Sequence, residues 1–312
     1  MSIFDQKVIK YEMKPLSSLE KVFPDETPVY RMECQMLSGL WGETVSFQVA
    51  YTGDFVMRER LDVRVVSELA EHVHVRTVEM VPVGRATNGI VDDNYLKTTS
   101  GLYPDLLKDL KDGKVIVYSR QWRSLWVDVD ITNEIPAGEY EIELQLIKEG
   151  EVVCSAKQKV TVIGTELPKL DIMHTEWMHA DCLADYYHVE VFSEEHWKLL
   201  ENYFQEYVKR DCNMMLTPLF TSPLDTAIGL ERTTCQLIDV EVKDGEYVFG
   251  FEKLKRWIDL CKKCGIEYFE MSHLFSQWGA KYAPKVVATV NGKKEKIFGW
   301  HTPAVGEYTK FL

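Results

Sequence analysis

The sequence predicts a multidomain protein: an all-β N-terminal β-sandwich, residues 1–165, precedes an incomplete (β/α)8 TIM-barrel-type α/β domain, residues 169–312. Three observations predict this division. Apolar residues alternate with period two through the first half, whereas strand-like and helical patterns alternate after residue 169. The segments that leave the predicted barrel strands are also much longer than those that enter them. This asymmetry is typical of a barrel whose site lies at the carboxyl ends of its strands.

Short stretches with period two predict the sandwich. In residues 44–51, TVSFQVAY, alternate apolar side chains share one face, and GEYEIELQLI at 138–147 places glutamates opposite its apolar face. Glycine-containing turns such as Asp112-Gly113 and Glu149-Gly150 separate the stretches, and no long helical pattern interrupts them. The other predicted strands are LDVRVV (61–66), HVHVRTVEMV (72–81), KVIVY (114–118), SLWVDVDI (124–131) and QKVTVI (158–163).

Residues 164–168 form the predicted linker, after which strands and helices alternate. Such alternation predicts a parallel sheet with right-handed crossovers. The helix boundaries follow from an N-cap serine with two glutamates behind it, and from a glycine after a lysine pair. In order, the predicted elements are a strand at 170–174, a helix from Ser193 to Lys209, a strand at 213–217, a helix ending at Gly265 and a strand at 266–271.

Two hairpins elaborate the long exits, at 236–251 and at 285–300, the second with the turn pair Asn291-Gly292. Residues 169–312 supply only three barrel strands, whereas a complete barrel usually needs about 250 residues. The last residues, EYTKFL, begin an apolar helical face. We therefore expect the sequence to be the front portion of a longer protein.

Composition limits the partners. The net charge of −13 repels phosphate backbones and anionic lipids, so we expect neither nucleic acid nor membrane as partner. No secretory leader or apolar stretch of about 18 residues is present, which predicts a cytoplasmic protein. The seven cysteines are scattered and odd in number, which favours reduced thiols. Cys261 and Cys264 form a CxxC inside a helical pattern without a second pair, so we expect one semi-buried and one helix-end cysteine, and no zinc site.

Polar and aromatic side chains follow the first predicted strand. His174, Glu176, His179 and Asp181 have atoms that could ligate a metal, but loop spacing does not direct them to one centre. The pattern therefore favours a polar ligand, or contacts among these side chains, over a metal ion.

The second and third exits add further candidates. Glu231 and Arg232 either bind a ligand or form a local charge pair. Trp177, Trp278 and Trp300 are either core residues or flat platforms for sugar rings, because the C–H faces of a sugar pack on aromatic faces. His273 is interpreted as a binding side chain. Glu270 lies on the strand itself and is expected to point outward toward a helix.

Long segments of the chain resemble glycoside hydrolase family 123, bacterial β-N-acetylgalactosaminidase-like proteins. LTPLFTSPLDTAIGLERTTCQLIDV (216–240) and YFEMSHLFSQWGAKYAPKVVATVNGKKEKIFGWHT (268–302) resemble the barrel segment of that family. GLYPDLL (101–107), QWRSLWVDVDI (121–131) and AGEYEIELQL (137–146) resemble its N-terminal sandwich. The resemblance extends over nearly the whole chain.

The resemblance implies a retaining glycosidase acting on terminal β-linked N-acetylhexosamine, GalNAc in particular, without a cofactor. The 2-acetamido group of the substrate attacks, an aspartate orients it, and an adjacent glutamate serves as acid and then base, an exception to the two-carboxylate scheme. No position of this chain matches that Asp-Glu pair, so no catalytic residue is assigned and the 312-residue chain is expected to be inactive. The expected substrate-binding residues are His174, Glu176, Trp177, Asp181, Asp225, Glu231, Arg232, His273, Gln277, Trp278 and Trp300.

Two alternatives stay open. In the first, Glu176 and Glu270 are an acid and nucleophile pair at two strand ends, which requires carboxyl groups about 5–5.5 Å apart. In the second, the protein is a non-catalytic carbohydrate-binding protein.

Overall fold

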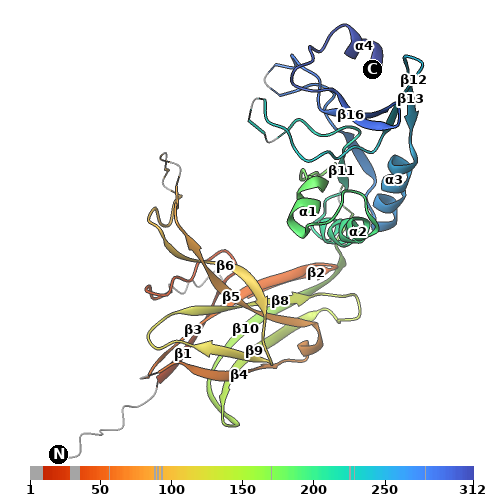
Figure 1. Ribbon diagram of the computed structural model, residues 1–312. Helices are drawn as coiled ribbons and strands as arrows, with labels where there is room; N and C mark the ends of the chain where they lie inside the picture. The colour runs from red at the N-terminus through yellow and green to blue at the C-terminus, as the bar shows by residue number, and fades with distance from the viewer. Residues whose placement is uncertain are drawn as a thin grey trace, which may run out of the picture. The chain divides into compact units, whose positions relative to one another are not determined.

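The computed structural model describes residues 10–28, 36–55, 57–87, 89, 91–92, 94–169, 171–224, 226–227, 229–277 and 279–312. The chain divides into two compact units, residues 1–168 and 169–312 (Figure 1). No helix within the described ranges is long and apolar enough to cross a membrane.

In its described part, unit 1 is built from two five-stranded sheets. The first sheet is antiparallel throughout, in the spatial order β1 (Lys10–Ser17), β3 (Thr44–Asp54), β8 (Arg123–Asp130), β5 (Val73–Val83) and β6 (Gly101–Asp109). The second has the order β2 (Met36–Trp41), β10 (Glu151–Glu166), β9 (Gly138–Lys148), β4 (Glu59–Val66) and β7 (Lys114–Val117), with β2 parallel to β10. A 3-10 turn, η2 (Ala70–His72), precedes β5.

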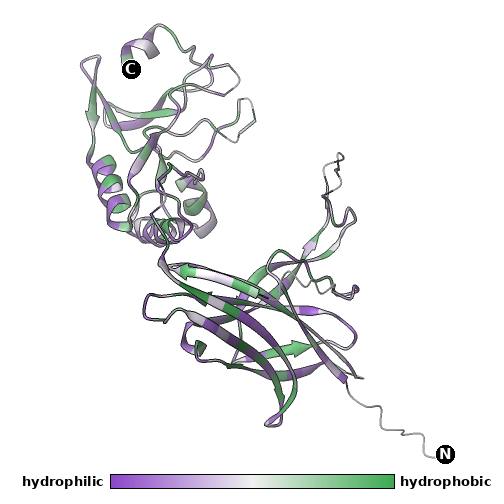
Figure 2. Ribbon diagram, turned by 180° about the vertical axis from the view of Figure 1, so that it is seen from behind, coloured by the Kyte–Doolittle hydropathy of each residue, from purple (hydrophilic) through white to green (hydrophobic). Residues whose placement is uncertain are grey.

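The apolar faces predicted for residues 44–51 and 138–147 contribute to the core between the sheets. Phe47 and Val49 of β3 are 1% exposed, and Leu144 and Leu146 of β9 are fully buried in the same cluster. Figure 2 shows hydrophobic and hydrophilic residues interchanging along these strands. The period-two pattern therefore identified the buried rows of the sandwich.

Three strands of unit 1, β1, β2 and β6, were not among the predicted ones. β1 and β6 contain Pro15 and Pro104, and each lies at an edge of the first sheet. Proline lacks the N–H needed for a ladder, so it is tolerated at edges while it weakens the strand signal in the sequence.

Unit 2 contains a two-stranded parallel sheet of β11 (Met214–Thr217) and β14 (Tyr268–Met271). Helices α2 (Glu194–Val208) and α3 (Glu252–Cys264) are the predicted ones, with Ser193 capping the first and Gly265, at φ 104°, ending the second. Their inward faces pack around Trp257, which is fully buried. Cys261 is also fully buried and Cys264 is half-buried, and burial raises the pKa of both thiols.

Both predicted hairpins are present, and they join. β12 (Asp239–Lys243) pairs with β13 (Glu246–Gly250), and β15 (Val286–Val290) pairs with β16 (Lys293–Phe298) across the turn at Asn291-Gly292. β12 also runs parallel to β15, so the hairpins form one four-stranded sheet. The helix α4 (Glu307–Phe311) packs Tyr308 and Phe311 against this sheet.

One prediction for unit 2 was wrong, and one helix was not predicted. The stretch 171–174 of the predicted strand LDIMH is not a strand, and Leu170 lies outside the described residues. The long exit that follows contains a helix, α1 (Ala180–Tyr187). Ala180, Leu183 and Ala184 have helical spacing and are buried, but the helix is short and its N-cap, His179, makes no side-chain cap hydrogen bond. Sequence signals for a helix start were therefore missing.

Candidate functional site

Because β11 and β14 are parallel, their carboxyl ends lie at one edge of the sheet. Thr217 and Met271 are opposite each other in the register, and the N–H of Ser272 donates to the carbonyl of Thr217 at 2.9 Å. The second and third exits thus begin side by side, as expected for strands joined by a helical crossover.

Asn213 attaches the segment before the first exit to the same sheet. Its side-chain oxygen accepts from the N–H of His174 at 2.8 Å, and its amide donates to the carbonyl of Ile172 at 2.8 Å. The backbone N–H groups of Asn213 and Met214 both point to the carbonyl of His174. The segment therefore lies beside the start of β11 although it forms no ladder.

Tyr207 supports the next residues of the first exit, a role that sequence reasoning missed. Its hydroxyl accepts from the N–H of Glu176 at 2.8 Å and lies 2.7 Å from the carbonyl of Met214, to which it can donate. Burial raises the pKa of Tyr207. In the sequence this tyrosine is one member of the apolar stripe of α2, so no local signal distinguishes it from a core residue.

Trp177 connects the first exit to the third. Its indole N–H donates to a carboxylate oxygen of Glu270 at 2.9 Å, and its ring meets that of His273 edge to face at 5.5 Å between centroids. Trp177 is 47% exposed. A ring held at its nitrogen and packed against one imidazole, with much of its area open, is suited to receive the apolar face of a ring-shaped ligand.

Asp181 and Arg232 join the first exit to the second. The Nε of Arg232 donates to Asp181 at 2.7 Å and its Nη2 donates to the other carboxylate oxygen at 3.2 Å. Burial opposes the charge on the guanidinium, but the contact with Asp181 raises the pKa of Arg232. Asp181 lies in the first turn of α1, where the helix dipole also favours a carboxylate.

Glu231, the neighbour of Arg232, pairs instead with Lys296 of β16 at 2.6 Å and with Lys285 at 3.7 Å. The hydrogen bond from Lys296 lowers the pKa of Glu231. Of the two alternatives left open by the sequence, the local pair between Glu231 and Arg232 is therefore not formed. Each side chain joins the second exit to a different element.

The remaining candidates are more scattered. His174 lies 3.6 Å from Glu176, and both side chains are exposed to solvent. Half-buried Trp300 packs near Tyr282, at 6.2 Å between ring centroids, and Gln277 is half-buried in the third exit. Asp225 and Trp278 lie outside the described residues. Among the residues that the structure describes, no cluster of three or more His, Cys, Asp or Glu side chains is placed to hold a metal ion.

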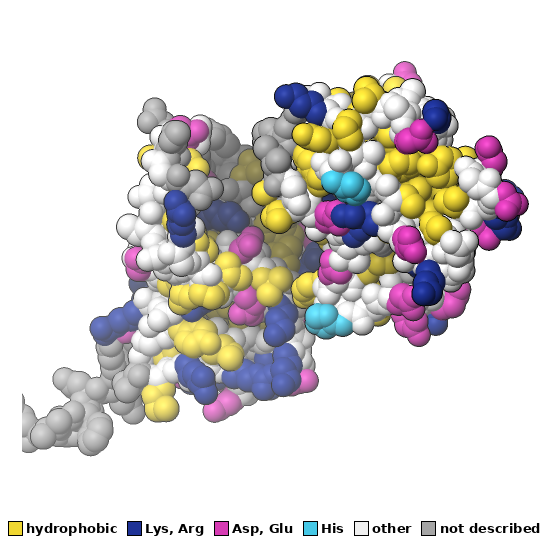
Figure 3. Space-filling model, turned by 45° about the horizontal axis from the view of Figure 1, so that its top comes forward, with side chains coloured by type: hydrophobic (Ala, Val, Ile, Leu, Met, Phe, Trp, Pro, Cys, Tyr) yellow, Lys and Arg dark blue, Asp and Glu magenta, His cyan; other side chains and the backbone are white. Residues whose placement is uncertain are grey.

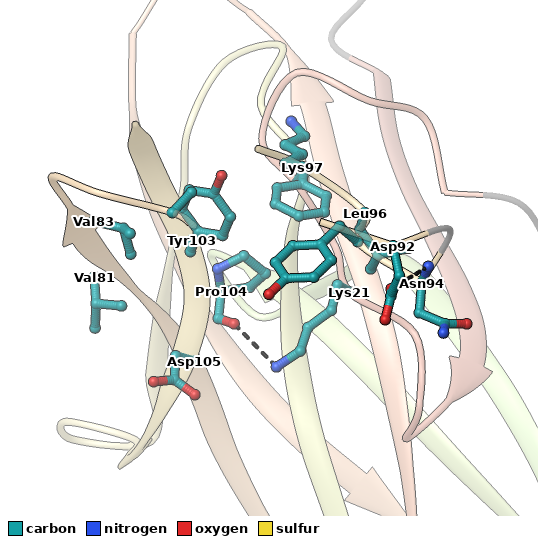
Figure 4. A pocket seen from close by; sticks show the side chains of 13 residues that line it. Lys21, Val81, Val83, Asp92, Asn94, Leu96, Lys97, Tyr103, Pro104 and Asp105 are labelled. Atoms are coloured by element: carbon teal, nitrogen blue, oxygen red, sulfur yellow. Dashed lines mark hydrogen bonds between the residues drawn. The ribbon is translucent and has the colours of Figure 1, made fainter. Parts of the chain in front are cut away.

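Several grooves open on unit 1, and two of them are relevant to ligand binding. One, of about 530 Å³, contains the aromatic residues Phe23, Tyr95 and Tyr103 beside Asn94 and Lys21 (Figure 4). Lys21 donates to the carbonyl of Pro104 at 3.3 Å across its floor. The other groove, of about 780 Å³, lies between the β5–β6 and β4–β7 sides of the sandwich.

Residues 177–312 match the family model described as the catalytic domain of glycoside hydrolase 123. No curated protein matches the chain. Among solved structures, the chain is similar to a family 123 glycoside hydrolase from Clostridium perfringens, described for glycolipid glycan hydrolysis, with 14% identity and a TM-score of 0.68. The alignment covers 97% of this chain and 55% of that one, so this chain spans about half the length of the solved relative.

Other matches are distant. A β-glucosidase from Listeria innocua has 10% identity and a TM-score of 0.24, covering 51% of this chain and 17% of that one. The N-terminal domain of PorA has 11% identity and a TM-score of 0.24, with 47% and 99% covered. TM-scores this low do not indicate a shared fold. The family model over residues 177–312 and the fold shared with the clostridial enzyme confirm the resemblance seen in the sequence: the chain is similar to glycoside hydrolase family 123 proteins.

Proposed function

We propose that this chain is part of a glycoside hydrolase that acts on terminal β-linked N-acetylhexosamine, GalNAc in particular, by substrate-assisted retaining hydrolysis. The observation that carries the proposal is the half-exposed ring of Trp177, held by Glu270 and His273 where the first and third exits meet. Such a ring can support the apolar face of a sugar while neighbouring carboxylates and imidazoles accept or donate to its hydroxyls.

The proposal assigns the Asp-Glu pair of the reaction to sequence outside residues 1–312. The aspartate would face the 2-acetamido group and the glutamate the leaving oxygen, and the residues of the described exits would form the opposite wall. The family match supports this assignment, together with the fact that the chain covers 55% of its solved relative.

The proposal also treats unit 2 as part of a (β/α)8 barrel. Support comes from the apolar surface beside its two-stranded sheet: Ile172 and Met173 are both 65% exposed, and Met271 is 47% exposed. Figure 3 shows hydrophobic side chains gathered on a broad exposed face of unit 2. Parallel sheets are normally covered on both faces, so further strands and helices would bury this surface.

The first test is release of p-nitrophenol from a β-GalNAc aryl glycoside. The 312-residue chain is expected to release none above the buffer rate, whereas a chain extended by an Asp-Glu-bearing segment is expected to be active. Hydrolysis by the 312-residue chain itself would contradict the assignment of the pair. Absence of activity in the extended chain, with correct folding shown by circular dichroism, would contradict the proposed reaction.

A second candidate function is carbohydrate binding without catalysis, favoured by the aromatic groove of unit 1. There the rings of Phe23 and Tyr103 meet edge to face at 5.7 Å, next to the amide of Asn94. Lys97 lies 3.9 Å from the Phe23 ring and pairs with Glu26 at 2.7 Å. Calorimetric titration of GalNAc into the chain and into Trp177→Ala and Tyr103→Ala separates the candidates, because each variant removes one of the two aromatic platforms.

A further inference from the structure

The second groove of unit 1 has a charge opposite to that of the whole chain. It is lined by six lysines and arginines and three carboxylates, whereas the chain has 36 basic and 49 acidic residues. Both sheets contribute to it, through β5 and β6 on one side and β4 and β7 on the other. A cationic hollow with low-dielectric walls concentrates anions even on an acidic protein.

Several of these cations have no counter-ion among the described residues. Arg60 pairs with Asp112 at 3.0 Å and Lys114 with Asp62 at 3.3 Å, and both pairs are exposed. Within the described ranges, Arg58, Lys108 and Lys111 form no ion pair. One lining carboxylate, Glu59, is occupied by Lys148 at 2.9 Å and by the hydroxyl of Tyr11. The groove therefore keeps a net positive charge.

Arg123 does not have the position of an ordinary surface charge that keeps a protein soluble. It begins β8, the central strand of the first sheet, and its guanidinium lies 5.0 Å from the centroid of the Tyr118 ring. Its Nη2 donates to the neutral side chain of Gln121 at 3.0 Å. Its Nε is buried and has no hydrogen-bond partner in the part of the chain that the structure describes. A guanidinium that has such an unpaired N–H is stabilised when an anion approaches.

Lysines at edge strands have a second role, since they discourage pairing with other chains. Lys108 of β6 and Lys114 of β7 fit that role, because β6 and β7 are edges of their sheets. Arg123 does not, because it lies on a central strand. Edge protection therefore accounts for only part of the charge.

We propose that this groove binds an acidic sugar, one that carries a carboxylate or a sulfate. The unpaired cations would take the acid group. Glu79 and Asp109 would accept hydrogen bonds from hydroxyls, and Val78 and Met80 with the Tyr118 ring would contact the apolar face of the sugar. An inorganic anion or a polyglutamate peptide has no hydroxyls for these carboxylates, and the net charge of −13 disfavours nucleic acid.

The test is calorimetric titration of the full chain at low salt with 3′-sialyllactose, a chondroitin sulfate disaccharide, lactose, inorganic sulfate and tetraglutamate. At least one of the two acidic sugars is expected to bind, and the other ligands at least about tenfold more weakly. Addition of about 0.5 M NaCl is expected to weaken the acidic sugar strongly. The two acidic sugars distinguish a carboxylate ligand from a sulfate ligand.

Two groove variants and one control locate the site. Arg123→Gln and the double variant Lys108→Gln/Lys111→Gln are each expected to weaken binding about tenfold. The double variant changes exposed side chains, so it remains informative if Arg123→Gln does not fold. The control Lys293→Gln/Lys294→Gln removes two exposed charges from β16 in unit 2 and is expected to bind like the parent.

Lack of binding by both acidic sugars would overturn the inference. So would equal binding of lactose, inorganic sulfate or tetraglutamate, or parental affinity in the Lys108→Gln/Lys111→Gln variant. The test does not depend on hydrolysis and can succeed or fail separately from the proposed reaction.

Discussion

The guanidinium of Arg232 holds the carboxylate of Asp181 with two hydrogen bonds, at 2.7 and 3.2 Å, across 51 residues of sequence. The two side chains are 10% and 8% exposed. Arg232 also donates to the carbonyl of Leu224 at 3.2 Å, so one side chain joins α1 to two points of the second exit.

This pair predicts a large cost for removing one partner. Arg232→Met leaves a buried carboxylate without compensation and is expected to lower the free energy of unfolding of unit 2 by about 3–5 kcal/mol. The double variant Asp181→Leu/Arg232→Met is expected to lose less, because neither charge remains buried. Urea unfolding followed by tryptophan fluorescence measures both.

The control is Arg256→Met, which breaks an exposed pair with Glu194 at 2.6 Å. Its loss is expected to be much smaller, because exposed pairs are screened by solvent. A double variant as unstable as Arg232→Met alone would contradict the explanation.

Tyr207→Phe is expected to destabilise unit 2 by about 1–3 kcal/mol, because the N–H of Glu176 and the carbonyl of Met214 lose their shared partner. The matched control is Tyr203→Phe on the same helix, whose hydroxyl meets that of Tyr187 at 3.0 Å at the surface. Equal thermal midpoints for the two variants would show that the Tyr207 hydroxyl does not support the first exit.

Trp177→Ala is expected to weaken GalNAc binding by about tenfold or more, measured by calorimetry. Trp177→Phe retains an apolar ring but loses the hydrogen bond to Glu270, so an intermediate loss is expected. The control is Tyr268→Ala, which changes an exposed side chain. Tyr268 begins β14, so it lies at the other end of the strand from the third exit. Unchanged affinity in Trp177→Ala would remove this ring from the proposed sugar-binding wall.

His196 predicts a pH dependence of stability. Its ring is fully buried, accepts from the N–H of Phe192 at 2.9 Å and lies 2.9 Å from the carbonyl of Ala180. Burial lowers the pKa of His196. As pH falls below about 6.5, the unfolded state therefore takes up the proton first, and stability falls by at most about 1.4 kcal/mol per pH unit.

Urea unfolding of unit 2 between neutral and mildly acidic pH measures this slope. His196→Gln, which keeps a donor and an acceptor, is expected to flatten it. An identical slope in parent and variant would assign the acid sensitivity to other groups.

The sequence predicted local structure well where backbone chemistry acts over a few residues. Ser193 and Gly265 marked the ends of α2 and α3, and Asn291-Gly292 marked a hairpin. α1 was not predicted because its start lacks a capping side chain, and β6 was not predicted because proline interrupts it. The join between the two hairpins could not be predicted, since β12 and β15 are far apart in sequence and pairing over such distances leaves no local pattern.

The sequence by itself determined which residues could form the walls of a site, because polar and aromatic side chains gather where strands end. Tertiary structure decided which of them meet. Trp177 contacts Glu270 across 93 residues and Arg232 contacts Asp181 rather than its neighbour Glu231. These partners depend on how helices and strands pack, and local propensity carries no information about such distant contacts. The charge of the sandwich groove likewise arises only when β4, β6 and β8 are brought together, within a chain whose overall composition is acidic.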